Sequence, residues 1–247
     1  MKTPENWQDR TELLLGTEKL ARLKNASVLV VGIGGVGAFA AEMLCRAGIG
    51  HMTLADGDQV EATNLNRQLP ALVSTLGKLK TDVVAERLKD IDPELELKLH
   101  PVYLQDDAID ALLDSDHFDC VLDAIDTLTP KIRLAKACLE RHLPLVASMG
   151  AGARLDPEKI ICKDISKTFN CTLAKAYRHG LAKLGIRHGI QAVFSTELPI
   201  RSAVREDFSG PHKRSTTGTI SFKPAVFGCH CAAAVIRRLT EPAESHS

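Results

Sequence analysis

A glycine-rich turn near the start of the chain has the residue types of a phosphate site. The apolar run 28–31 predicts a buried strand, and the small residues after Val36 predict a tightly packed helix. Four glycines lie between this strand and the start of the helix: Gly32, Gly34, Gly35 and Gly37. A strand that turns directly into a helix aims free backbone N–H groups outwards, where they can bind phosphate. Alone, the turn is also compatible with an ordinary strand–helix connection.

An acidic residue and a polar loop follow the turn in the sequence. Asp56 closes the next predicted strand, 51–55, where a carboxylate can accept hydrogen bonds from ribose hydroxyls. Ligands of open α/β sheets bind at the carboxyl ends of the strands, which is where the loop after Asp56 begins. The loop adds these candidate ligands: Asp58, Asn64, Asn66, Arg67 and Gln68.

Two lysines and two aspartates are further candidates at the same edge. Lys78 and Lys80 lie at the start of a predicted helix, 77–91, from which either can reach a phosphate over the glycine turn. The helix dipole disfavours cations there, which favours a functional role. Asp126 ends the predicted strand 118–126 and can hold a divalent cation that bridges phosphate oxygens. For Asp123 we expect the simpler role of orienting the loop.

Strands and helices alternate along the first 150 residues. Further helices are predicted at 36–47 and 127–141, and further strands at 95–99 and 144–148. This alternation predicts an α/β fold with a Rossmann-like, doubly wound and mostly parallel sheet. We divide the chain into an N-terminal helical arm whose short helix is capped by Thr17, a nucleotide-binding core, a basic segment that completes the same domain, and a tail: 1–26, 27–150, 151–240 and 241–247.

The formal net charge of zero conceals an asymmetry. Residues 1–150 contain 16 Lys and Arg against 23 Asp and Glu, whereas residues 151–240 contain 15 against 6. The basic segment is a candidate surface for a polyanion. Its predicted elements are two strands, a basic helix, a loop and an Ala-rich final helix: 160–165, 191–195, 171–184, 206–218 and 224–239.

Cysteine usage and hydropathy indicate the cellular compartment in which we expect the protein. Seven scattered cysteines without a pair of Cys-x-x-Cys motifs favour a reducing environment and argue against a structural zinc. Cys229 and Cys231 fall in the predicted final helix, where packing is the expected role. The chain has neither a signal-peptide pattern nor an apolar run near the roughly 20 residues of a membrane span. We expect a cytoplasmic protein without membrane contact.

The motifs together resemble the ThiF/MoeB/HesA group of the ubiquitin-activating-enzyme superfamily, most strongly over residues 10–150. The resemblance rests on Gly32-x-Gly34-Gly35-x-Gly37, Asp56-x-Asp58, Asn64-x-Asn66-Arg67-Gln68, Lys80 and Asp126. Within the group, the chain is most similar to the tRNA threonylcarbamoyladenosine dehydratase (TcdA or CsdL-like) family, through Asp123-Ala124-Ile125-Asp126, Gly150-Ala151-Gly152 with Leu155-Asp156-Pro157, and Val193-Phe194-Ser195-Thr196-Glu197. Residues 200–218 diverge from its enterobacterial members.

The resemblance implies an activity and the roles of individual residues. The family uses ATP and magnesium to adenylate the threonyl carboxylate of N6-threonylcarbamoyladenosine in tRNA, and the activated acyl group is then captured within the molecule to give the cyclic form. By this resemblance, Gly34 and Gly35 approach the phosphates, and Asp56 binds the ribose. The other implied roles are charge neutralisation by Asn66, Arg67 and Lys80, magnesium binding by Asp126, and contact of Arg10 with the neighbouring subunit's site in a homodimer. A sulfur-relay protein is a further expected partner.

Three other functions are compatible with parts of the pattern. A related enzyme would adenylate the C-terminus of a ubiquitin-like sulfur carrier, using the same nucleotide motif. A nicotinamide-dependent oxidoreductase would use the glycine turn and Asp56, but residues 64–68 and Asp126 would have no clear role in hydride transfer. A non-catalytic RNA-binding or sulfur-relay protein would not need the full set of polar residues.

Overall fold

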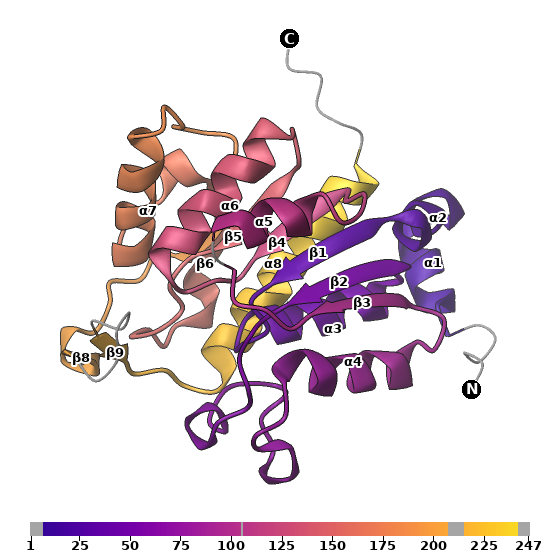
Figure 1. Ribbon diagram of the computed structural model, residues 1–247, viewed down its shortest axis with the longest axis horizontal. Helices are drawn as coiled ribbons and strands as arrows, with labels where there is room; N and C mark the ends of the chain where they lie inside the picture. The colour runs from indigo at the N-terminus through magenta and orange to yellow at the C-terminus, as the bar shows by residue number, and fades with distance from the viewer. Residues whose placement is uncertain (1–6, 105, 207–214, 242–247) are drawn as a thin grey trace.

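A seven-stranded sheet forms the centre of the computed structural model, which describes residues 7–104, 106–206 and 215–241 (Figure 1). Its strands are β1 (Ser27–Val31), β2 (His51–Ala55), β3 (Glu96–His100), β4 (Cys120–Asp123), β5 (Leu145–Ser148), β6 (Ile160–Asp164) and β7 (Gln191–Ser195). They lie in the order β3-β2-β1-β4-β5-β7-β6. Neighbouring strands are parallel except β6 and β7, which are antiparallel.

Helices cover both faces of this sheet (Figure 1). The N-terminal α1 (Asp9–Leu15) packs on α2 (Thr17–Asn25). One face carries α2, α3 (Gly37–Ala47), α4 (Lys80–Ile91) and α8 (Phe222–Thr240), and the other carries α5 (Asp106–Leu113), α6 (Leu128–Glu140) and α7 (Thr172–Ala182). Alternate residues of β1 divide between the two cores: Val28 and Val30 join the first, and Leu29 and Val31 the second. Because both faces are buried, the central strands are continuous apolar runs.

The order of the strands places a topological switch point beside β1. The sheet grows from β1 through β2 to β3 on one side and through β4 to β5 on the other, with Val28 paired to both Met52 and Cys120. Ligands of doubly wound sheets bind at the carboxyl ends of strands at this point. The predicted Rossmann-like, mostly parallel sheet is confirmed, and the glycine turn after β1 lies at the expected position.

Short elements connect the layers. The 3-10 turns of the described residues are η1 (Ala62–Asn64), η2 (Val73–Thr75), η3 (Pro157–Lys159), η4 (Ile165–Lys167) and η5 (Arg201–Ala203). A separate antiparallel pair is formed by β8 (Val204–Glu206) and β9 (Ser215–Thr217). The predicted loop 206–218 is therefore wrong at Glu206 and at 215–217, since Glu206 pairs with Ser215 in this hairpin. Residues 207–214 of the predicted loop lie outside the described residues.

One predicted helix start and one predicted helix cap are also wrong, and glycine conformation explains both. Gly77 has a φ of +81° and cannot continue a helix, and Lys78 O accepts a hydrogen bond from Val60 N, so α4 begins only at Lys80. Gly16, with a φ of +84°, separates α1 from α2 and occupies the N-cap position predicted for Thr17. Within the described residues, the structure contains no helix that is long and apolar enough to cross a bilayer.

Candidate nucleotide-binding site

The glycine turn joins β1 to α3 through two close backbone approaches. Gly32 has a φ of +86°, and a Cβ atom there would lie 2.9 Å from the Ala124 carbonyl carbon. A Cβ on Gly37 would lie 1.8 Å from Gly32 O, so this position requires glycine for α3 to begin beside the turn. The residue before α3, Val36, provides no side-chain cap. Ala38 N donates to Gly34 O at 3.2 Å, whereas Gly37 N and Phe39 N have no backbone acceptor within the described residues and are available to an anion.

Asp56 is fixed against the glycine turn from the end of β2. Its Oδ2 accepts a hydrogen bond from Ile33 N at 2.6 Å, and its Oδ1 accepts one from Asp58 N at 2.8 Å. Burial raises the pKa of Asp56, although Lys80 and the two backbone donors oppose that effect. The two hydrogen bonds leave lone pairs on the carboxylate for a ribose hydroxyl.

Lys80 and Asp58 form an ion pair at the same edge. Lys80 Nζ lies 2.7 Å from Asp58 Oδ2, with the lysine side chain 6% exposed and the aspartate side chain 49% exposed. The Tyr103 hydroxyl also donates to Asp58, and this bond raises the pKa of Tyr103. Sequence reasoning missed Tyr103, which follows β3 and reaches Asp58 only because β2 and β3 are adjacent in the sheet.

The loop after Asp58 is held together by its own polar side chains. Asn64 is buried, and its Oδ1 accepts from Glu61 N at 3.1 Å, so in this structure it stabilises the loop. Arg67 Nη1 donates to Thr63 O and to Asn66 Oδ1. Asn66 Nδ2 donates to Thr219 O at 3.0 Å, which ties the loop to the segment before α8.

Gln68 brings an unsatisfied acceptor to the glycine turn. Its Nε2 would lie 3.7 Å from a Cβ on Gly34, so the amide faces the turn. Its Oε1 is buried and has no hydrogen-bond partner within the described part of the chain. Buried acceptors are normally paired, so this atom fits a donor group of a bound ligand. The orphaned oxygen and the uncapped α3 together suit a nucleotide.

Asp126 is exposed beyond β4, next to the turn. Its Oδ1 accepts from Thr127 Oγ1 at 3.4 Å. Among the described residues there is no cluster of three or more His, Cys, Asp or Glu side chains that could hold a metal ion. A magnesium ion carried by nucleotide phosphates needs only one or two protein carboxylates, so a lone Asp126 fits that mode of binding.

A buried ion pair supports the strand end that carries Asp126. Lys131 Nζ lies 3.0 Å from Asp123 Oδ2, and both side chains are 0% exposed. Asp123 Oδ1 accepts from Ile125 N at 3.0 Å, and Lys131 Nζ donates to Ile125 O at 3.0 Å. Asp123 thus orients the loop, as the sequence predicted. Lys131 was missed, because a lysine within an amphipathic helix predicts a surface position.

Arg10 does not join the other candidates within one chain. It is exposed on α1, whose neighbour Gln8 donates to Arg46 O near the end of α3. The glycine turn lies at the opposite end of α3, which has 11 residues and is about 16 Å long. Arg10 therefore does not reach the site of its own chain.

A second polar cluster, next to Pro224 of α8, which would lie 3.1 Å from a Cβ on Gly35, was not predicted from the sequence. The Glu197 carboxylate accepts from Leu155 N and Asp156 N, and lies 3.4 Å from the buried Lys223 Nζ at the start of α8. Arg154 is buried and donates to the Gly150, Gly152, Asn170 and Glu197 carbonyls. These contacts fix the bend after β5 to the end of β7.

The cysteines of the final helix are poor candidates for catalysis. Burial raises the pKa of Cys231 and of Cys229. A raised pKa disfavours the reactive thiolate. The role of the buried Cys231 is therefore to pack in the core, not to catalyse a reaction.

Fold and site together define a nucleotide-binding α/β protein of the Rossmann-like class. The ThiF family model matches residues 9–247. A tRNA threonylcarbamoyladenosine dehydratase of Bacillus subtilis (strain 168) is 46% identical over 198 residues, or 80% of this chain and 77% of that protein. The chain therefore belongs to the ThiF family and, within it, to the tRNA threonylcarbamoyladenosine dehydratases.

A solved structure and a more distant relative delimit this similarity. The Escherichia coli tRNA N6-threonylcarbamoyladenosine dehydratase TcdA, solved in complex with ATP, has a TM-score of 0.86 and 33% identity, with 100% of both chains covered. The adenylyltransferase and sulfurtransferase MOCS3 of Culex quinquefasciatus is 38% identical, but over 54% of this chain and 30% of that protein.

Proposed function

We propose that this chain is an ATP-dependent enzyme that converts N6-threonylcarbamoyladenosine in tRNA to its cyclic form by removing water. The observation that carries the proposal is the meeting, at one sheet edge, of the glycine turn, Asp56, the Lys80–Asp58 pair and the unsatisfied Gln68 oxygen. Membership of the dehydratase family and the likeness to the ATP-bound TcdA structure support this proposal.

ATP supplies the leaving group that a carboxylate lacks. A threonyl carboxylate oxygen attacks the α-phosphorus and pyrophosphate departs, after which a nucleophile of the same modified nucleoside attacks the acyl carbon. AMP leaves with the former carboxylate oxygen, and a proton is released to solvent. The nucleoside loses one oxygen to AMP and one hydrogen from its nucleophile. Together with the proton that the carboxyl group had already lost on ionisation, this equals one water.

The side chains of this chain hold and neutralise the reacting groups. The Gly37 and Phe39 N–H groups at the start of α3 bind the phosphates. Asp56 accepts from the ribose hydroxyls, and Gln68 Oε1 accepts from a ligand donor. Arg67, with Asn66, and Lys80 stabilise the charge that develops on the α-phosphate and on pyrophosphate. Because Lys80 is paired with Asp58 in the free site, it must exchange this partner for phosphate.

Other parts of the proposal concern the metal, the assembly and the location. Asp126 would hold magnesium, whose charge would lower the cost of bringing anions together. Arg10 acts in the site of a second subunit, which requires a homodimer. A cytoplasmic location and a sulfur-relay protein partner remain predictions.

The test is to incubate the protein with ATP, magnesium and tRNA isolated from cells that lack this protein, and to measure the mass of the modified nucleoside. We expect the loss of one water, dependent on ATP. Lys80→Ala should abolish the conversion, whereas Lys89→Ala, an exposed lysine on the same helix, should not change it. An unchanged nucleoside mass with the wild-type protein would overturn the proposal, and pyrophosphate exchange that requires a carrier protein instead of tRNA would favour the sulfur-carrier alternative.

A further inference from the structure

Helix α7 connects the site to the far edge of the sheet. A Cβ on Gly150, just after β5, would lie 3.6 Å from Sγ of Cys171, the residue before α7. After α7 the chain returns to the start of β7, where Ile190 O accepts from Ile165 N. The helix has 11 residues and therefore runs about 16 Å from the carboxyl edge to the amino edge.

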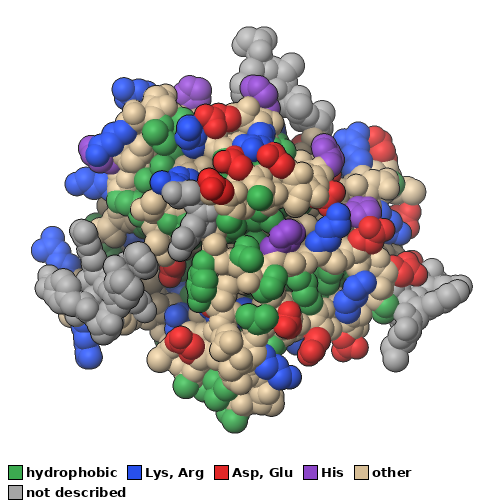
Figure 2. Space-filling view, viewed as in Figure 1, with side chains coloured by type: hydrophobic (Ala, Val, Ile, Leu, Met, Phe, Trp, Pro, Cys, Tyr) green, Lys and Arg blue, Asp and Glu red, His purple; other side chains and the backbone are tan. Residues whose placement is uncertain are grey.

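The segment around this helix carries cations without carboxylates. Residues 165–190 contain no Asp or Glu, but contain the following basic residues: Lys167, Lys175, Arg178, His179, Lys183, Arg187 and His188. We call the surface of residues 165–190 the α7 face. Figure 2 shows Lys, Arg and His side chains gathered over the region that Figure 1 labels α7.

The lysines and arginines of the α7 face are not engaged in ion pairs, and His188 lies near the Asp164 carboxylate, whose pKa it helps to lower. In the described ranges, none of the Lys and Arg residues of 165–190 lies within ion-pair distance of a carboxylate. The adjacent Asp164 is occupied by Ser166 N and Oγ and by Gly189 N. Lys175, His179 and Lys183 follow one another at four-residue spacing and are exposed, so they form a stripe opposite the buried side of the helix.

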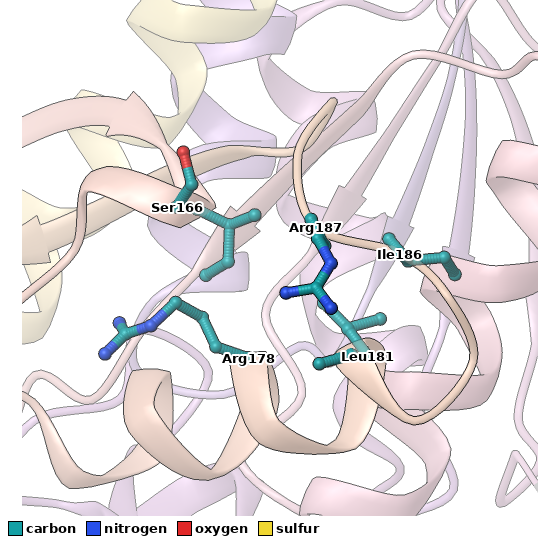
Figure 3. Close-up of a pocket in the computed structure, with 7 residues that line it drawn as sticks. Ser166, Arg178, Leu181, Ile186 and Arg187 are labelled. Atoms are coloured by element: carbon teal, nitrogen blue, oxygen red, sulfur yellow. The ribbon is translucent and has the colours of Figure 1, made fainter.

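A hollow lies at the amino-edge end of the α7 face (Figure 3). It has a volume of about 320 Å³, with an apolar floor that includes Ile165, Leu181 and Ile186. Arg178 and Arg187 flank it, and in Figure 3 the Arg187 guanidinium lies above Leu181. Arg178 is fixed by a hydrogen bond from Nη1 to Thr168 O at 2.9 Å, which leaves its other N–H groups for an anion.

An exposed aromatic ring lies at the opposite end of the α7 face, at the carboxyl edge of the sheet. Phe169 is 49% exposed, and its ring meets Phe194 edge-on at a centroid distance of 5.5 Å. The next residue, Asn170, donates to Thr196 O just after β7, which places Phe169 at the carboxyl edge. Because about half of Phe169 is exposed, its ring is open to stacking, and unpaired bases stack on exposed aromatic rings.

We infer that the α7 face binds the substrate tRNA next to its modified loop, with Phe169 stacking on an unpaired base and the basic stripe and hollow binding backbone phosphates. The inference rests on the proposed function, and the α7 face begins beside the bend after β5, where Arg154 joins the Gly150 and Gly152 carbonyls to the Asn170 carbonyl. Phosphate contacts by Lys and Arg give affinity without sequence information. The exposed ring favours RNA over an acidic protein, for which the cations alone would suffice.

The test compares two charge-matched variants of the full protein. Lys175→Glu/Lys183→Glu/Arg187→Glu reverses three exposed cations of the α7 face, and Lys19→Glu/Lys24→Glu/Lys89→Glu reverses three exposed lysines of α2 and α4. We expect the first variant to raise the tRNA Kd by about 10- to 100-fold and to reduce the salt slope of binding by roughly 2 to 3. The second should keep the wild-type Kd and slope, and both should bind ATP as wild type does.

Two further measurements keep the inference falsifiable. Phe169→Leu, which keeps the apolar contact with Phe194, should raise the Kd for tRNA and leave the salt slope of binding unchanged. Neither Phe169→Leu nor the α7-face triple variant should change kcat at saturating tRNA. Equal Kd values and salt slopes for the two triple variants would overturn the inference, as would a wild-type Kd in Phe169→Leu. Because binding is measured without turnover, tRNA binding without conversion would refute the proposed function alone.

Discussion

The buried Asp123–Lys131 pair supports a quantitative prediction. Both side chains are inaccessible to solvent, and Lys131 Nζ holds the Asp123 carboxylate and the Ile125 carbonyl at 3.0 Å each. Lys131→Met keeps most of the side-chain volume but leaves a carboxylate buried without its counter-charge. Removing one partner of a buried pair costs about 3–5 kcal/mol. Because domains are stable by about 5–15 kcal/mol, this is a large part of the total.

The assay is urea unfolding of each variant, monitored by circular dichroism. Lys136→Met is the matched control: it lies on the same helix and pairs with Glu140 at 3.4 Å, but the two side chains are 49% and 60% exposed. An exposed pair of this kind contributes about 0–1 kcal/mol. Asp123→Asn/Lys131→Met should be less destabilised than Lys131→Met alone, because no buried charge remains. A cost for Lys131→Met that equals the cost for Lys136→Met would refute the reasoning.

The pH dependence of the same variant gives an independent check. Burial raises the pKa of Asp123 above its ordinary value, and Lys131 opposes this effect. Without Lys131, the folded-state pKa rises further, so the folded state favours the protonated carboxyl. Stability then falls as the pH rises through the folded-state pKa and recovers as the pH falls towards the unfolded-state value. The loss of stability in Lys131→Met should therefore be smaller at acidic pH than at neutral pH, and a constant loss would contradict the assignment.

Three other substitutions test the site. Gly37→Ala introduces a Cβ 1.8 Å from Gly32 O and should destabilise the protein by about 1–3 kcal/mol in the same unfolding assay, whereas Gly150→Ala meets its nearest neighbour at 3.6 Å and should cost less. Gln68→Leu removes the unsatisfied acceptor and should raise the KM for ATP several-fold without changing thermal stability; an unchanged KM would leave that oxygen without a ligand role. If Arg10 acts in a second subunit, mixing Arg10→Ala with Lys80→Ala protein should restore activity at one site, and the absence of any recovery would exclude action between subunits.

Local sequence determined the parts of the fold that depend on burial and backbone conformation. Strands β2 and β7 have the predicted bounds 51–55 and 191–195, because apolar runs buried on both faces are unambiguous. The glycine spacing located the turn, and the acidic residue after β2 was placed correctly beside it.

Contacts between distant segments could not be predicted in this way. Tyr103 reaches Asp58, Lys223 reaches Glu197 and Asn66 reaches Thr219 only after the strands have assembled. The reversed direction of β6 likewise follows from its pairing with β7, since the apolar pattern of a strand carries no direction. The interior position of Lys131 depends on a carboxylate from another element.

The closed pair of Lys80 and Asp58 has a consequence for ligand selection. In the free site the lysine charge is already neutralised at 2.7 Å, so a simple anion such as chloride gains little by approaching it. A phosphate group that binds Lys80 has to displace Asp58, so the free energy of the ion pair is subtracted from the free energy of binding. The pair therefore discriminates against weakly binding anions and favours a ligand whose other groups are bound by the rest of the site.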